Sequence, residues 1–147
     1  MYRFADDKNM KTMTVEAAIH NIPQVTEWVD AELDILHCPV KARMQIDIAM
    51  DEILSNIAYY AYAPGTGEMT VGFEALPDGH GAWFEFTDRG RPYNPLENAE
   101  PDISLPAEDR SEGGLGILLV RKTMDEVRYE YRDGANVLTI RKNWIQG

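Results

Sequence analysis

The sequence predicts an α+β domain, a two-layer α/β sandwich in which a mixed, mostly antiparallel sheet is covered by helices on one face. Three observations favour this class. Apolar residues recur at three- and four-residue steps between residues 39 and 62, as in a long helix with one buried side. Two segments follow in which apolar residues alternate with other residues, as in strands. Two more such segments flank a turn signal near the end of the chain. The 147 residues suit one core, so we expect a single domain over residues 1–147.

The first half of the chain predicts one strand and two helices. Asn9–Ile19 can form the strand, and Ile22–His37, with apolar residues at helical steps, can form the first helix. The second and longer helix is predicted over Pro39–Tyr62. Pro39 suits a first helical turn, because its fixed φ is helical and its missing N–H would have no partner there. Residues 63–67, which read Ala-Pro-Gly-Thr-Gly, end the helix.

The second half predicts two pairs of strands. Glu68–Ala75 and Gly81–Asp88 alternate apolar with other residues, and the alternation of the second puts Asp88 at the end of its apolar row. A final hairpin is predicted from Val127–Arg132 and Asn136–Lys142. Residues 133–135, Asp-Gly-Ala, form a turn signal between them.

Composition narrows the classes of function. The formal charge of −11 argues against nucleic acid as a partner, since phosphate binding relies on clustered Lys and Arg. No apolar run approaches the roughly twenty residues of a membrane helix, and residues 1–7 do not resemble a secretory signal. We therefore expect a cytoplasmic protein with protein partners and no membrane contact. The one cysteine, Cys38, is expected to be a structural thiol.

Glu52 and Asn56 lie four residues apart in the predicted long helix, so both side chains project from one side of it. Mg²⁺ prefers oxygen ligands and keeps several waters, so one Asn oxygen and phosphate oxygens can hold it while Glu52 acts as a base. Taken alone, the pair would more often be a solvated helix face, because polar residues at helical spacing usually face water. Nearby Asp47 and Asp51 could raise the pKa of Glu52 and tune it as a base.

Asp88 and Gly90 belong to the sequence Asp88-Arg89-Gly90. A carboxylate at the end of an apolar row needs a hydrogen-bond partner, and an adenine amino group is a suitable donor. Gly90 would let the backbone approach the base closely. An Asp that opens a tight turn would give the same three residues.

Four residues, Gly113-Gly114-Leu115-Gly116, precede a probable helix over residues 117–124. Free N–H groups at such a helix start, approached through residues that lack Cβ, form a site for phosphate oxygens. Taken alone, the same four residues could instead form a flexible hinge that binds no phosphate. Neither the dinucleotide-binding fingerprint nor a Walker loop occurs in the chain.

Together these three stretches resemble the N box and the glycine boxes of the Bergerat-fold ATPases, the superfamily of gyrase-type ATPases, sensor histidine kinases and heat-shock chaperones. Residues 49–56, 88–95 and 113–127 resemble more closely its anti-sigma-factor serine/threonine protein kinase branch. The resemblance covers nearly the whole chain. It implies the Bergerat, or histidine-kinase-like ATPase, fold with ATP and Mg²⁺ as cofactors.

The resemblance implies a role for each matching residue. Glu52 would be the catalytic base, Asn56 the Mg²⁺ ligand and Asp88 the adenine-reading carboxylate. The residues that it places along the nucleotide are Gly90, Gly113, Gly114, Leu115 and Gly116.

The resemblance also implies a mobile lid over about residues 91–112, in which Arg110 could reach a terminal phosphate. Two departures from the family pattern stand out. Residues 59–62 read Tyr-Tyr-Ala-Tyr where many relatives carry a His-Ala pair, which could alter the pocket wall or a partner surface. Asn94 stands where relatives often have Asp, so a role for charge there is in doubt.

Two functional hypotheses remain from these residues. The first, implied by the resemblance, is an ATP-dependent serine/threonine protein kinase and anti-sigma-type regulator that phosphorylates a small, STAS-like antagonist protein and also holds a sigma factor. The second is a nucleotide-gated protein-binding module that transfers no phosphate. The catalytic half of a sensor histidine kinase and a small-molecule ATPase are less well supported. Members of this branch commonly form homodimers, but the apolar periodicity identifies no interface.

Overall fold

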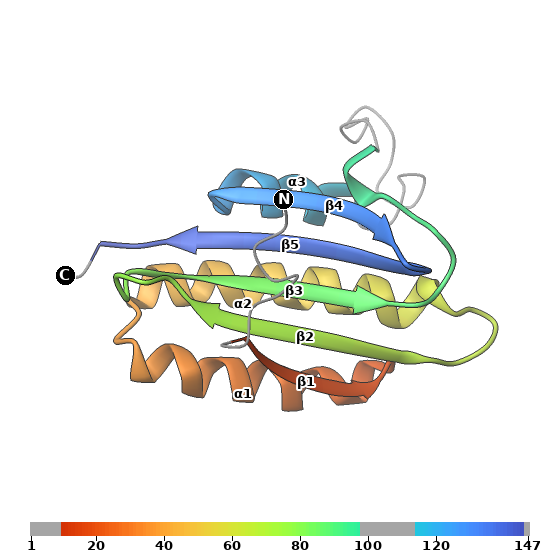
Figure 1. Cartoon of the computed structure of the whole chain (residues 1–147), viewed down its shortest axis with the longest axis horizontal. Coiled ribbons are helices and arrows are strands. Elements are labelled where there is room, and N and C mark those ends of the chain that lie inside the picture. The colour runs from red at the N-terminus through yellow and green to blue at the C-terminus, as the bar shows by residue number, and fades with distance from the viewer. Residues whose placement is uncertain (1–9, 98–113, 146–147) are drawn as a thin grey trace.

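The computed structural model describes residues 10–97 and 114–145, and Figure 1 shows how their elements are arranged. In chain order the elements are β1 (Lys11–Glu16), the 3-10 turn η1 (Ile19–Asn21), α1 (Ile22–Ile35), α2 (Val40–Asn56), the π-helical segment η2 (Ile57–Ala61), β2 (Glu68–Ala75), β3 (Gly81–Asp88), the 3-10 turn η3 (Pro95–Glu97), α3 (Gly114–Thr123), β4 (Glu126–Arg132) and β5 (Ala135–Asn143).

The strands form one five-stranded sheet in the order β1-β2-β3-β5-β4. Every pairing between the described strands is antiparallel. The predicted sheet was mostly antiparallel but mixed, and the described strands include no parallel pair. The register aligns apolar residues across the sheet, with Val71 opposite Phe86 and Phe86 opposite Leu138. Because side chains alternate along a strand, these residues share one face.

The three α-helices lie on that same face of the sheet (Figure 1). The two-layer α/β architecture is therefore confirmed. Between the layers lies a continuous apolar core, whose largest fully buried side chains include Leu33, Ile46, Met50, Phe84 and Phe86. Of the helices within residues 10–97 and 114–145, none has both the length and the hydropathy that a membrane span requires.

Several element boundaries differ from the predicted ones. The predicted strand over residues 9–19 is shorter, because the chain turns into η1 at Ile19. Pro39 has φ −62° and ψ 149° and is the extended N-cap residue of α2, not part of its first turn. The predicted long helix is interrupted, since α2 ends at Asn56 and continues as the π-helical η2.

The last hairpin shows local turn chemistry. Asp133 and Gly134 both have positive φ, at 54° and 78°. Arg132 pairs with Ala135, so the loop contains only these two residues and Ala135 already belongs to β5. Two successive positive φ angles are typical of the type I′ turn, whose twist matches that of the flanking strands.

Carboxyl groups meet where α1 packs against α2. Burial and a hydrogen bond with Asp30 raise the pKa of Asp47 to about 7, while the Arg43 guanidinium opposes this shift. Arg43 also contacts the carboxylates of Asp30, at 3.5 Å, and of Asp34, at 2.5 Å. The partner of Asp47 is therefore Asp30 of α1, and not Asp51, which is exposed on α2.

Asp47→Asn should stabilise the protein at alkaline pH. Folding raises the pKa of Asp47, so the folded state binds the proton more tightly and stability falls as pH rises from about 4 to about 7. The amide cannot ionise, so the variant should lack this decline. Near pH 8 its melting temperature should exceed that of wild type by about 2–4 °C, the change that about 1 kcal/mol produces in a domain of this size.

Thermal unfolding followed by circular dichroism at several pH values measures this effect. Asp51→Asn, on the exposed side of the same helix, is the control and should leave the pH profile unchanged. A pH profile of Asp47→Asn that overlays the wild-type profile would rule out Asp47 as the titrating group.

Candidate functional site

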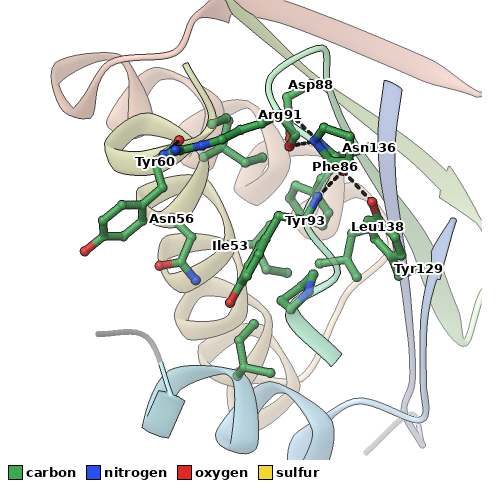
Figure 2. Close-up of a pocket in the computed structure, with 15 residues that line it drawn as sticks. Ile53, Asn56, Tyr60, Phe86, Asp88, Arg91, Tyr93, Tyr129, Asn136 and Leu138 are labelled. Atoms are coloured by element: carbon green, nitrogen blue, oxygen red, sulfur yellow. Dashed lines mark hydrogen bonds between the residues drawn. The ribbon is translucent and has the colours of Figure 1, made fainter. Parts of the chain in front are cut away.

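A cavity of ≈ 560 Å³ lies between α2 and η2 on one side and β3, β5 and β4 on the other (Figure 2). Its walls are mainly apolar and aromatic, with a small number of polar groups. The lining residues are Ile53, Asn56, Ile57, Tyr60, Ala61, Phe86, Asp88, Arg91, Pro92, Tyr93, Pro95, Ile117, Tyr129, Asn136 and Leu138. A cavity of this size and character suits a planar, mostly apolar ring with a few hydrogen-bonding groups.

Asp88 is the buried carboxylate of this cavity, with 6% of its surface exposed. It ends the inward row of β3, as its alternation with Phe84 and Phe86 predicts. Burial raises its pKa, and hydrogen bonds from the Asn136 amide and the Gly90 N–H oppose that shift. Both donors bond to Oδ1, each at 2.9 Å. Oδ2 is therefore the atom that an N–H donor of a bound molecule would meet.

Glu52 and Asn56 are joined by a hydrogen bond along α2. The Asn56 side-chain nitrogen donates to Oε2 of Glu52 at 3.0 Å. This bond fixes the orientation of the amide, because its nitrogen faces Glu52 and its oxygen must then face away. Asn56 and Asp88 stand on opposite walls of the cavity (Figure 2). The arrangement can supply a base, a neutral oxygen ligand and a buried acceptor within one site.

Gly116 brings α3 against this pair. A Cβ at Gly116 would lie 1.9 Å from Cδ of Glu52, so the Glu52 carboxylate occupies the space that a side chain would need. Gly114 is the first residue of α3, one turn before Ile117, which lines the cavity. The start of α3 and Glu52 therefore lie side by side.

Gly90 makes a second close approach, here to η2. A Cβ at Gly90 would lie 2.1 Å from the backbone oxygen of Ala61. The same oxygen accepts a hydrogen bond from the backbone N–H of Arg91 at 3.0 Å. The Arg91 side chain donates a second hydrogen bond to the backbone oxygen of Tyr60 at 2.9 Å. The chain after β3 is thus tied to η2.

Tyr62, the residue after η2, joins the start of β2 to the chain after β3. Its hydroxyl donates a hydrogen bond to the backbone oxygen of Glu68 at 2.6 Å and accepts one from the backbone N–H of Arg89 at 2.7 Å. Tyr60 and Ala61 line the cavity. Two residues of the Tyr-rich stretch at residues 59–62 therefore form part of the cavity wall.

The structure does not describe every predicted site residue. Arg110 and Gly113 lie outside the described residues, and for Leu115 only the backbone is described. The predicted lid over residues 91–112 is described only up to residue 97. In that part Asn94 has a local role, because its side-chain oxygen accepts a hydrogen bond from the Leu96 N–H at 2.9 Å at the start of η3.

Two polar residues of the cavity, Tyr129 and Asn136, lie outside every segment that was predicted to form the site. Asn136 lies opposite Asp88 in the pairing of β3 with β5. Alternation along the last strand places it on the same face as two apolar residues, Leu138 and Ile140, so a polar residue at an inward position was the available signal.

Gly90→Ala should weaken both the fold and the site. The added Cβ would meet backbone atoms of Ala61, and a backbone cannot rotate away as a flexible side chain can. We expect a loss of about 1–3 kcal/mol in the free energy of unfolding, typical of overpacking. Denaturant titration measures the loss. Gly65→Ala is the control, because its nearest contact is 3.3 Å. Equal stabilities of the two variants would contradict the close approach.

Known proteins resemble this chain in sequence and in fold. It is 32% identical over 98 residues to the serine-protein kinase RsbW of Bacillus cereus, a match that covers 62% of this chain and 58% of that protein. It is 28% identical over 100 residues to the serine/threonine-protein kinase BtrW of Bordetella bronchiseptica, with 68% and 70% covered. The chain thus spans a little over half of the Bacillus cereus relative.

A solved structure of the RsbU and RsbW domains of Rv1364c from Mycobacterium tuberculosis shares the fold, with a TM-score of 0.65 at 17% identity. That match covers 91% of this chain and 32% of the other. The model of the histidine kinase-like ATPase domain matches residues 15–142, which is most of the chain. This chain therefore belongs to the histidine kinase-like ATPase domain family.

Proposed function

We propose that this chain is an ATP-dependent serine/threonine protein kinase that acts as an anti-sigma-type regulator. The observation that carries the proposal is the composition of one cavity. It has a buried carboxylate, Asp88, on one wall and Asn56 on the other, and Asn56 is hydrogen-bonded to Glu52. The similarity to proteins named serine-protein kinase RsbW and serine/threonine-protein kinase BtrW supports the same activity.

The cavity fits the base of ATP. Apolar side chains such as Phe86, Ile53 and Leu138 would pack against the two faces and the edge of an adenine ring. Oδ2 of Asp88 would accept a hydrogen bond from the exocyclic amino group, and Oδ1 keeps its two protein donors. A keto group at that position, as in guanine, would instead face the carboxylate without a proton to share.

The phosphates would extend toward Glu52 and the start of α3. The Glu52 carboxylate fills the position that a Cβ at Gly116 would take, so it lies against the start of α3, and free N–H groups at a helix start favour anions. The hydrogen bond from its nitrogen to Glu52 directs the oxygen of Asn56 away from that carboxylate, which suits a ligand of Mg²⁺. Mg²⁺, when bound, would neutralise charge on the phosphate oxygens.

The transfer step assigns one task to Glu52. Its carboxylate would take the proton from a serine or threonine hydroxyl of the substrate protein while that oxygen forms a bond to the γ-phosphorus. The bond between the γ-phosphorus and the β–γ bridging oxygen breaks, and ADP leaves with that electron pair. The bond from Asn56 would keep the carboxylate in position for this proton.

The proposed substrate is a small, STAS-like antagonist protein, and a sigma factor is the proposed second partner. The names of two relatives, a serine-protein kinase and a serine/threonine-protein kinase, support a protein as the substrate. Such partners would place the protein in the cytoplasm. A homodimer is the proposed assembly, on the pattern of the resembling branch. The formal charge of −11 suits contacts with basic protein segments.

Glu52→Gln should keep ATP binding and lose phosphotransfer. Glutamine preserves the shape and can still bond to Asn56 but cannot take a proton, and general bases contribute roughly 10²–10⁴-fold in rate. Calorimetry with Mg-ATP measures binding, and radiolabelled transfer to a purified STAS-type antagonist domain measures the reaction. Asp51→Asn, one residue earlier and exposed, is the control and should transfer at the wild-type rate.

Undiminished transfer by Glu52→Gln would remove Glu52 from the mechanism. Wild-type protein that binds Mg-ATP and the antagonist domain but transfers no phosphate would replace the kinase with the nucleotide-gated binding module.

Asp88→Asn should reduce ATP affinity by about 10–100-fold, the range expected when a hydrogen bond to a charged group is lost. The amide places an N–H₂ group where the carboxylate offered an acceptor. Calorimetric titration of Mg-ATP and Mg-ADP measures the loss, with circular dichroism to verify folding. Asp78→Asn, in the exposed loop between β2 and β3, is the control. Wild-type affinity in Asp88→Asn would show that Asp88 does not read the base.

A further inference from the structure

Asn136 holds an unusual position in β5. It is 7% exposed and faces inward, where its neighbours on the same face, Leu138 and Ile140, are core residues. A buried primary amide has two N–H donors and an oxygen that accepts two hydrogen bonds. Each of these that stays unmade costs stability, so the partners of such a group define its role.

The Asn136 amide has a partner for each of its four bonding positions. Its nitrogen donates to Oδ1 of Asp88 and to the backbone oxygen of Arg91, both at 2.9 Å. Its oxygen accepts from the Tyr93 N–H at 3.0 Å and from the Tyr129 hydroxyl. Figure 2 shows these bonds converging on the one side chain. The amide is saturated, so it can act on a ligand only through the groups that it holds.

Those groups belong to two parts of the site. Asp88 ends β3 and lines the cavity, whereas Arg91 and Tyr93 belong to the chain that continues from β3 toward residue 97. Tyr129 attaches the amide to β4. One side chain therefore fixes the carboxylate and the following segment relative to each other.

We propose that Asn136 is a positioning residue that sets Asp88 and the backbone of residues 91–93 in a single geometry, so that base binding and the conformation of this segment are coupled. The inference rests on the proposed function in one respect, namely that the cavity binds the base of ATP. It adds a residue that does not touch the nucleotide but governs its affinity.

Other side chains would not reproduce this set of bonds. Alanine would leave Oδ1 of Asp88 with one donor, would remove the Asn136 donor from the Arg91 oxygen, and would leave the Tyr129 hydroxyl as an acceptor for the Tyr93 N–H. Aspartate would still accept from Tyr93 and Tyr129 but would place a second carboxylate against Asp88. The two substitutions thus separate the accepting half of the amide from its donating half.

The pH dependence of binding distinguishes positioning from a general effect on folding. The hydrogen bond from Asn136 lowers the pKa of Asp88 against the effect of burial, so removing it should raise that pKa further. Among the described residues, the titratable or charged groups that line this cavity or flank Asp88 are Arg89, Arg91, Tyr60, Tyr62, Tyr93 and Tyr129. Burial raises the pKa of Tyr62 and Tyr129, which therefore stay neutral near pH 7.

The sign of the pH effect follows from the ionised form of Asp88. Only the carboxylate offers a full acceptor to the amino group, so affinity is present above the pKa of Asp88 and is lost as pH falls through it. In Asn136→Ala this loss should begin at a higher pH than in wild type.

The experiment is calorimetric titration of Mg-ATP into wild type, Asn136→Ala, Asn136→Asp and the control Asn143→Ala between about pH 5.5 and pH 8. Asn143 is exposed at the far end of the same strand. We expect Asn136→Ala to bind about tenfold more weakly near pH 8, as for the loss of one buried hydrogen bond, and weaker still at lower pH. Asn143→Ala should match wild type.

Amide hydrogen exchange of Tyr93 tests the second half of the coupling. Exchange should be faster in Asn136→Ala, which lacks the Asn136 oxygen as one of its acceptors, and near the wild-type rate in Asn136→Asp, which keeps an oxygen there. Saturation with Mg-ATP should slow this exchange in wild type but not in Asn136→Ala. If Asn136→Ala fails to fold, Tyr129→Phe replaces it, because it removes only the hydroxyl bond to the amide.

Unchanged affinity and pH dependence in folded Asn136→Ala, beside a wild type that binds Mg-ATP, would overturn the inference alone. No effect of ATP on Tyr93 exchange in wild type would also overturn the coupling. Wild type that binds no Mg-ATP would overturn both the inference and the proposed function. ATP binding without phosphotransfer would remove the kinase proposal but leave the role of Asn136 intact.

Discussion

The pairing of β3 with β5 places a carboxylate and an amide opposite each other at the end of an otherwise apolar row, and the rest of the site depends on this contact. Removing a carboxylate from water is costly unless donors replace the solvent. Asn136 and the Gly90 N–H are those donors, and they leave one oxygen of Asp88 for the cavity. A slip of β5 by one residue in this register would turn Asn136 to the other face of the sheet, away from Asp88.

The opposite wall depends on a change of helix type. The chain is α-helical through Asn56 and π-helical from Ile57 to Ala61, so the polar pair of α2 is followed directly by the segment that lines the cavity. Short π-helical segments often occur at functional sites, because they alter the direction of the following side chains. Here the last carbonyl of η2 is bonded to the backbone of Arg91, which lets the two walls approach across Gly90.

Much of this arrangement could be predicted from the sequence, and the parts that could not have a common physical reason. The alternation of residues and the flanking turn signals predicted β2 and β3 with the bounds that the structure has. The four-residue spacing predicted that Glu52 and Asn56 share one side of a helix, where they are hydrogen-bonded. The π-helical segment was not predicted, since its apolar residues continue a helical pattern. Asn136 was missed because its partner lies 48 residues earlier, and only the register of the sheet brings the two together. Periodicity describes one element at a time, whereas these contacts join several.

The strand order also decides where this fold can change in evolution. The chain leaves the sheet at the end of β3 and returns at β4, and β5 fills the place between these two strands. All four pairings are therefore made by segments outside residues 89–125. Because the entropy of closing a chain segment grows slowly with its length, insertions or deletions between η3 and α3 would cost the sheet little. Homologous domains could thus diverge greatly in length there and still present the same carboxylate and the same helix to a nucleotide.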